Sequence, residues 1–169
     1  MDFAPVTDEE VTLLLARAGT GRRVLDVGCG TGALAAALAD AGFTVTGIDF
    51  SAAALAAAED RHGHRTDLAF RLLDIEHGGL TSLPAGGFDL ITCRLFLPFI
   101  DLLPFTACAR HLLAPGGTLH ITTPVDDRPP DGGRSIALRT ADLDLLRTFP
   151  WQSTAEYPLG SLLCLALTL

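Results

Sequence analysis

Short apolar runs alternate with amphipathic segments along most of the chain. The runs are rich in Val, Ile, Leu and Phe, have the length of buried strands, and predict strands at 23–27, 44–48, 68–73, 88–93 and 118–123. The segments between them have the length and composition of helices, and predict helices at 6–18, 33–41, 51–63, 101–113 and 141–148. Strands that alternate with helices in this way indicate an α/β fold.

The predicted architecture is doubly wound, with a mainly parallel seven-stranded sheet and helices on both faces. Two further strand-like runs, 151–157 and 162–168, predict a C-terminal hairpin that adds an antiparallel strand. Since no repeat or linker composition divides the chain, residues 1–169 are expected to form a single domain. Residues 1–22 are expected to supply an N-terminal helix that acts as a lid, and residues 124–139 a short substrate-side loop.

Local signals mark where some of these elements begin. Thr7, with Glu10 three residues later, predicts a capping box for the first helix, and Ser51 predicts the cap of the third. The Pro-Gly-Gly sequence at 115–117 predicts a turn. Residues 75–87, which are rich in Gly, predict a loop.

The composition excludes several classes of protein. All 12 basic residues are Arg, and the chain contains neither Lys nor Asn. Without Lys there is neither a Schiff-base enzyme nor a Walker P-loop. The net charge of -8 argues against nucleic-acid binding, which needs clustered positive charge. A small-molecule substrate is therefore the expected partner.

Cysteine and apolar patterns suggest the compartment. The four cysteines are scattered and form no C-x-x-C pair, which is typical of reduced thiols and not of a zinc site or a disulfide frame. The apolar runs are too short to span a bilayer, and the first ten residues do not resemble a signal peptide. We expect a cytoplasmic protein with no membrane partner and no metal. The five histidines are expected mainly at the surface.

A glycine-rich turn follows the first predicted strand and reads Asp26-Val27-Gly28-Cys29-Gly30-Thr31-Gly32. Alternate glycines let the backbone turn sharply, approach a ligand and start a helix. Dinucleotide enzymes use G-x-G-x-x-G, with a pyrophosphate at the helix N-terminus. Here the spacing is G-x-G-x-G, and the carboxylate of Asp26 would repel a pyrophosphate. Both features point away from NAD and toward a ligand that carries an amino-acid cation.

With this turn the sequence resembles the class I S-adenosylmethionine-dependent methyltransferases, from about residue 23 to residue 123. The second strand, ending at Asp49, and the segments 72–75, 88–91 and 113–119 match further motifs of that family in the correct order. The resemblance implies that S-adenosylmethionine is the cofactor and S-adenosylhomocysteine the product. It also implies that Asp49 holds the ribose hydroxyls.

The resemblance further places Phe50 on the adenine face, and Asp74 with the Ile75 N–H on the adenine edge. Arg94, at the end of the fourth strand, is a candidate to hold a carboxylate of cofactor or substrate. The alternative for Arg94 is a salt bridge to a neighbour such as Asp101. The full set of expected cofactor-binding residues is Asp26, Gly28, Cys29, Gly30, Thr31, Gly32, Asp49, Phe50, Asp74, Ile75 and Arg94.

The acceptor side carries fewer signals. Methyl transfer needs alignment more than a fixed catalytic residue, so no catalytic residue is assigned. Because Lys is absent, an anionic acceptor must be held by Arg94, Arg128 or Arg134, and Phe96 belongs to an apolar stretch that could line the pocket. Asp126 and Asp127 lack a carboxylate partner after the fourth strand, so no metal site is expected. The acceptor site is expected to be open, or to be completed by a second subunit in a homodimer.

The predicted function is S-adenosylmethionine-dependent methyl transfer to a small molecule in bacterial biosynthesis. Two alternatives stay open at this point. The same cofactor fold also serves reactions without methyl transfer, such as cyclisation or rearrangement, and it also occurs in binding-only proteins that retain the cofactor pocket. The shared cofactor motifs do not distinguish these three functions.

Overall fold

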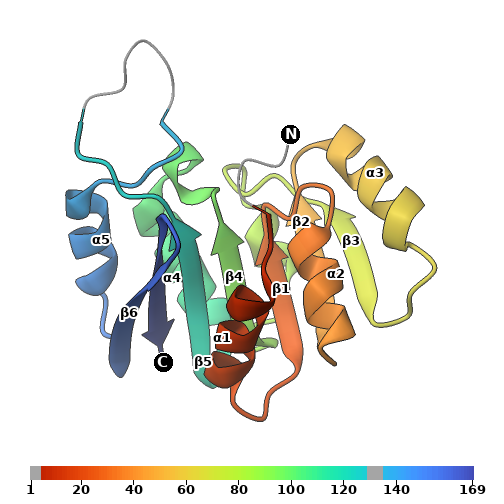
Figure 1. Ribbon diagram of the computed structural model, residues 1–169, viewed down its shortest axis with the longest axis horizontal. Helices are drawn as coiled ribbons and strands as arrows, with labels where there is room; N and C mark the ends of the chain where they lie inside the picture. Colours follow the sequence, from red (N-terminus) through yellow and green to blue (C-terminus); the bar gives the residue numbers. More distant parts are fainter. Residues whose placement is uncertain (1–4, 129–134) are drawn as a thin grey trace.

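Seven strands form one sheet in the order β3-β2-β1-β4-β5-β7-β6 (Figure 1). The structure is a computed structural model, and it describes residues 5–128 and 135–169. Strands β1 to β5 pair in parallel, whereas β7 pairs antiparallel with β5 and with β6. This confirms the predicted mainly parallel sheet with a C-terminal antiparallel hairpin. The strands are β1 (Arg23–Val27), β2 (Thr44–Asp49), β3 (Leu68–Leu72), β4 (Phe88–Arg94), β5 (Leu113–Thr123), β6 (Ser153–Leu159) and β7 (Leu162–Thr168).

Helices cover both faces of the sheet, with α1, α2 and α3 on one face and α4 and α5 on the other (Figure 1). Successive strand residues point to opposite faces, so Val24 and Leu90 pack in the core beneath α1 and α2. Leu25 and Ile91 pack in the larger core beneath α4 and α5. The helices are α1 (Asp8–Ala18), α2 (Ala33–Asp40), α3 (Ala52–His62), α4 (Leu102–Leu112) and α5 (Thr140–Arg147).

The predicted helix caps are present, with one difference. The Ser51 hydroxyl accepts the Ala54 N–H at 3.2 Å, and the Thr7 hydroxyl accepts the Glu10 N–H at 3.2 Å. In the second half of the predicted capping box, the Glu10 carboxylate would accept the backbone N–H of Thr7. That carboxylate is instead buried and bound to Arg94, which lies 84 residues along the chain.

The Pro-Gly-Gly sequence at 115–117 lies inside β5 and does not form a turn ahead of it. Phe88 of β4 pairs with Leu113, but Leu90 already pairs with Thr118, so the register shifts across this segment. Gly116 adopts a φ of 75°, a left-handed conformation that glycine takes at little cost. The turn residues therefore produce an irregularity within a long strand. In the predicted loop 75–87 the structure has one short 3₁₀ helix, η1 (Gly79–Ser82).

The order of the strands in the sheet indicates where a ligand site should lie. From β1 the chain first builds β2 and β3 on one side, and it then returns to build β4 on the other side of β1. Ligands of open α/β sheets bind at the carboxyl ends of the strands beside such a reversal. The relevant edge is therefore formed by the ends of β1, β2 and β4. Among residues 5–128 and 135–169, no helix has the length and apolar character needed to cross a bilayer.

Candidate functional site

The glycine turn between β1 and α2 has a backbone that few other residues could adopt. Gly28, Gly30 and Gly32 have φ values of 70°, 54° and 82°, all in the left-handed region. The Gly28 N–H donates to the Ile48 carbonyl at 2.9 Å, which fixes the turn against β2. A Cβ at Gly28 would lie 2.6 Å from the ring of Phe96, whereas a Cβ at Gly30 would meet nothing within 4 Å. The turn is thus packed against a side chain at Gly28 and has free space beside its backbone at Gly30.

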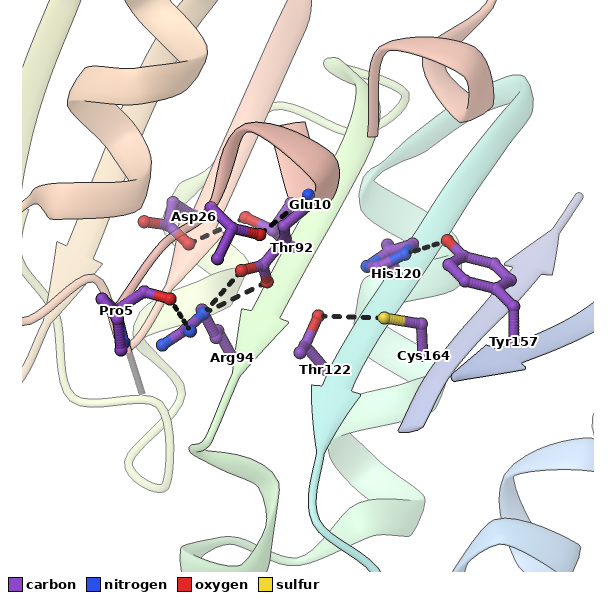
Figure 2. Close-up of polar contacts among 10 residues, drawn as sticks. Pro5, Glu10, Asp26, Thr92, Arg94, His120, Thr122, Tyr157 and Cys164 are labelled. Atoms are coloured by element: carbon purple, nitrogen blue, oxygen red, sulfur yellow. Dashed lines mark hydrogen bonds and ion pairs between the residues drawn. The ribbon is translucent and has the colours of Figure 1, made fainter. Parts of the chain in front are cut away.

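Asp26 lies at the foot of this turn with only 2% of its surface exposed. Its Oδ1 accepts the Thr92 hydroxyl at 2.7 Å, and its Oδ2 has no hydrogen-bond partner in the described part of the chain (Figure 2). Burial raises the pKa of Asp26 to about 7, with further increases from Glu10 and Asp49, while Thr92 and Arg94 act in the opposite direction. A buried carboxylate oxygen without a donor is costly, and a ligand ammonium group would satisfy it.

Arg94 ends β4 and binds the N-terminal segment. Its Nε donates to Oε1 and Oε2 of Glu10 at 3.1 and 3.2 Å, and its Nη2 donates to the Pro5 carbonyl at 3.2 Å (Figure 2). The Arg94 and Glu10 side chains are 13% and 1% exposed, so this ion pair is buried. Asp101, the alternative partner considered from the sequence, instead caps α4 by accepting the Leu103 N–H at 3.2 Å.

The next residue, Leu95, is strained. Its φ of 55° is the only positive value for a non-glycine residue within 5–128 and 135–169. Its N–H donates to the Thr122 carbonyl at 2.9 Å, and its side chain packs against the small core of Leu159, Leu162 and Cys164. This conformation breaks the strand alternation, since Arg94 binds Glu10 of α1, Leu95 packs on the same small core as Leu13 of α1, and Phe96 turns toward Gly28.

Asp49 and Phe50 follow β2. The Asp49 carboxylate accepts the Gly30 N–H at 2.9 Å and the Ser51 N–H at 2.8 Å, so the backbone fixes its orientation. A carboxylate has about four lone-pair sites, and two backbone bonds leave capacity for a ligand diol. Phe50 is 68% exposed, which is unusual for a large apolar ring and provides a surface for stacking.

Asp74 and Ile75 follow β3 and line a cavity. One oxygen of Asp74 lies 2.7 Å from Nδ1 of His77, and the other accepts the Glu76 N–H at 3.1 Å. The hydrogen bond with His77 is the main cause that lowers the pKa of Asp74, so this carboxylate is ionised at neutral pH. The sequence analysis did not assign His77, although its spacing of three residues from Asp74 was a usable signal.

A cavity of about 980 Å³ extends from these residues across the carboxyl edge of the sheet. This is the upper end of the range for small-molecule sites, so it has room for more than one ligand. Phe50, Asp74 and Ile75 line one part of it. The other part is mainly apolar and includes Phe96, Leu97, Pro98, Phe99, Ile100, Leu102, Ala137 and Leu138.

The described parts of the predicted substrate-side loop lie at this cavity. Arg128 lines it, but its guanidinium is bound to Asp126 through bonds of 2.7 to 3.1 Å, and its side chain is 87% exposed. Asp127 accepts the N–H and the hydroxyl of Thr140, each at 2.7 Å, and so holds the start of α5. Arg134, the remaining candidate, lies outside the described residues.

The remaining titratable groups show no metal cluster or reactive thiol. Within the described ranges, no group of three or more His, Cys, Asp or Glu is arranged to hold a metal. Burial raises the pKa of Cys29 and strongly raises that of Cys93, so both thiols are protonated at neutral pH. Neither is therefore activated as a nucleophile.

A second polar cluster lies beneath α1, away from the cavity. His120 Nε2 is hydrogen-bonded to the Tyr157 hydroxyl (Figure 2), and the Arg17 guanidinium lies 5.1 Å from the Tyr157 ring centroid. His120 is 1% exposed, and burial lowers its pKa to about 4. The expectation of surface histidines is wrong for this residue, because α1 covers its strand.

The structure brings most of the expected cofactor residues to one edge of the sheet. Sequence reasoning missed Thr92 and Glu10, which bind Asp26 and Arg94. A polar Thr within a buried apolar strand was a signal for the first. The second was identified only as a helix-capping residue.

Known proteins share both this sequence and this fold. The family model described as a methyltransferase domain matches residues 25–119. The ubiquinone biosynthesis O-methyltransferase of Methylococcus capsulatus is 38% identical over 104 residues, which cover 61% of this chain and 44% of that protein. The chain thus spans about half the length of the curated relatives that it matches.

Solved structures match nearly the whole chain. An S-adenosylmethionine-dependent methyltransferase from Mesorhizobium loti has a TM-score of 0.74 at 21% identity. The match covers 95% of this chain and 96% of that protein. Phosphoethanolamine N-methyltransferase 2 of Haemonchus contortus, solved with S-adenosyl-L-methionine, has a TM-score of 0.74 at 20% identity. The match covers 92% of this chain and 40% of that protein. The chain therefore belongs to the methyltransferase domain family and has the class I S-adenosylmethionine-dependent fold.

Proposed function

We propose that this protein binds S-adenosylmethionine and transfers its methyl group to a small-molecule acceptor. The observation that carries the proposal is the buried, unpartnered Oδ2 of Asp26 at the foot of a glycine turn. A cationic amino-acid group is the ligand that this oxygen accommodates, and a phosphate is the one that it repels. Family membership supports the same cofactor.

The cofactor residues divide by the part of the ligand that they would hold. Asp26 and the backbone of 28–32 would hold the methionine end, and Asp49 would accept from the ribose hydroxyls. Phe50 would stack on the adenine, with Asp74 and the Ile75 N–H at its edge. When bound, S-adenosylmethionine supplies an electrophilic methyl group on a sulfonium sulfur. The protein's part is to orient the acceptor and exclude water.

The acceptor side favours an apolar ligand without a strong negative charge. Its wall at 96–100 is apolar, and the charge of Arg128 is largely neutralised by Asp126. Glu76 and Asp142 line the same cavity and add two negative charges, against one further positive charge from Arg139. We therefore propose a neutral or cationic acceptor, and no nucleic acid, in line with the net charge of -8.

Two further parts of the proposal concern the whole protein. Its four cysteines are free thiols, which supports a cytoplasmic location. Completion of the open acceptor site by a second copy stays a prediction. Light scattering on the purified protein tests it, since a monomeric mass would exclude a homodimer.

The test combines binding with transfer. S-adenosylmethionine is incubated with the protein and a panel of phenols, amines and thiols, and products are identified by mass spectrometry. A product heavier by one methylene group, with an equal amount of S-adenosylhomocysteine, supports transfer. A product without S-adenosylhomocysteine release supports a reaction without methyl transfer, and tight binding with no product supports a binding-only protein.

A variant pair tests the cofactor site. Asp49→Ala removes the carboxylate expected at the ribose, and we expect it to weaken S-adenosylhomocysteine binding by about 1.5 to 3 kcal/mol. Asp60→Ala removes the same group from an exposed position on α3 and serves as the control. Equal calorimetric affinities for both variants and the unaltered protein would contradict the ribose role of Asp49.

A further inference from the structure

A methionine group carries an ammonium and a carboxylate on the same carbon, so a site for it needs a negative and a positive side chain close together. Asp26 is the negative one. Thr92, which donates to Asp26, and Arg94 lie two residues apart on β4, so their side chains share one face of the sheet. The positive charge of Arg94 also acts to lower the pKa of Asp26. Arg94 is therefore a cation on the same face of the sheet as Asp26, and Figure 2 shows its guanidinium against Glu10 and Pro5.

The guanidinium of Arg94 already has a carboxylate partner. Both oxygens of Glu10 accept from the Arg94 Nε. Glu10 lies in the first turn of α1, and its side chain is almost completely buried. Burying two charges is expensive, so such a pair is weak evidence for a purely stabilising role. Glu10 presents to Arg94 the same chemical group that a methionine carboxylate would present.

The rest of α1 is attached independently of this pair. Leu14 and Ala18 are buried against the sheet and anchor the second half of the helix. The first turn, in contrast, has exposed side chains at Asp8 and Glu9, and its side-chain contact with β4 is made by Glu10. The residues just before it are held by the partly buried Val6 and by the Pro5 carbonyl, which also binds Arg94. The first turn can thus be released while the helix stays docked.

We propose that Glu10 occupies Arg94 as an internal substitute for the methionine carboxylate of the cofactor, which takes over the guanidinium on binding and releases the first turn of α1. The inference rests on the proposed function, because it assumes that the cofactor has an amino-acid end. The N-terminal helix would then have a specific role, because its Glu10 side chain would compete with the cofactor for Arg94.

Two probes separate the amino-acid end from the rest of the ligand. S-adenosylhomocysteine carries the methionine-derived group, whereas 5′-methylthioadenosine has the same adenosine and thioether without it. Glu10→Gln removes the competing charge, and Glu9→Gln removes an exposed charge from the same helical turn. By calorimetry we expect Glu10→Gln to bind S-adenosylhomocysteine roughly tenfold or more tightly, as for one charged hydrogen bond. Its affinity for methylthioadenosine, and both affinities of Glu9→Gln, should be unchanged.

The Arg94→Gln variant should change the affinity for S-adenosylhomocysteine in the opposite direction. It should weaken S-adenosylhomocysteine roughly tenfold or more and leave methylthioadenosine unchanged. Hydrogen exchange on the unaltered protein needs no variant. Amides of the first turn of α1 should exchange faster with S-adenosylhomocysteine bound than with methylthioadenosine bound.

The outcomes are distinguishable. Weaker or unchanged S-adenosylhomocysteine binding by a folded Glu10→Gln protein would overturn the inference, because Glu10 would then not compete with the ligand. If Glu10→Gln does not fold, hydrogen exchange decides, and equal exchange with both ligands overturns the inference. In these cases the proposed cofactor stands, since the unaltered protein still binds it. Failure of the unaltered protein to bind either ligand would overturn the proposed function and the inference together.

Discussion

The buried carboxylate of Asp26 makes cofactor binding depend on pH in a direction that the structure fixes. Its pKa is raised to about 7, so without a ligand it holds a proton below that pH and is ionised above it. The charged groups that act on it are Glu10 of α1, Asp49 of β2 and Arg94 of β4. A ligand ammonium favours the ionised form, so binding below about pH 7 must release the proton.

The size of the effect follows from the same pKa. At about pH 6, roughly nine-tenths of the ligand-free molecules carry the proton on Asp26. Binding there should release about that fraction of a proton per ligand, and the affinity should fall by up to roughly tenfold for each further pH unit below. Above about pH 7 the carboxylate is already ionised, and its contribution to the pH dependence disappears.

Calorimetry in buffers of different ionisation enthalpy measures the released protons directly. S-adenosylhomocysteine is the probe, and Asp26→Asn is the control, since it keeps the shape of the site but cannot titrate. The variant should bind more weakly and without this proton release. The reasoning about Asp26 is refuted if the unaltered protein releases no proton at about pH 6, or if Asp26→Asn releases as much.

Two further predictions concern the frame of the site. Gly28→Ala and Gly160→Ala both place a Cβ on a left-handed glycine, but only the first meets a ring, at 2.6 Å. Thermal unfolding should show Gly160→Ala less stable by about 1 kcal/mol and Gly28→Ala by clearly more; equal losses would contradict the close contact with Phe96. His120 has a pKa lowered to about 4, so its ring resonances should stay constant from about pH 5 to pH 8 in NMR titrations. A midpoint in that range would contradict its burial beneath α1.

Predictions that rest on neighbours in the sequence agree with the structure. The caps Thr7 and Ser51 work through backbone groups three residues away, and the central strands follow from runs of apolar residues. The glycine turn also needs only local information, because alternate left-handed glycines dictate its course. The match of the Asp26 carboxylate to a ligand cation, inferred from its place before that turn, stays a prediction.

Predictions that depend on distant contacts were incomplete. Asp26 and Thr92 are 66 residues apart, and Glu10 and Arg94 are 84 apart, so no local periodicity connects them. The Gly116 turn was misplaced because strand pairing on both sides of it keeps β5 continuous. His120 appeared to be a surface residue because the sequence did not reveal that α1 covers that face of the sheet.

The left-handed conformation of Leu95 gives the two halves of the site separate sequence requirements. Holding a leucine at positive φ costs about 1 to 3 kcal/mol, and the packing of its side chain against Leu159, Leu162 and Cys164 contributes to offsetting that cost. Because the reversal occurs within this residue, Arg94 before it faces α1 and residues 96–100 after it line the apolar part of the cavity. Residues 97–100 could therefore be exchanged by design with less effect on the cofactor side than Phe96, whose ring lies against Gly28. Leu95 thus separates the side where we propose that the cofactor binds from the wall where we propose that the acceptor binds.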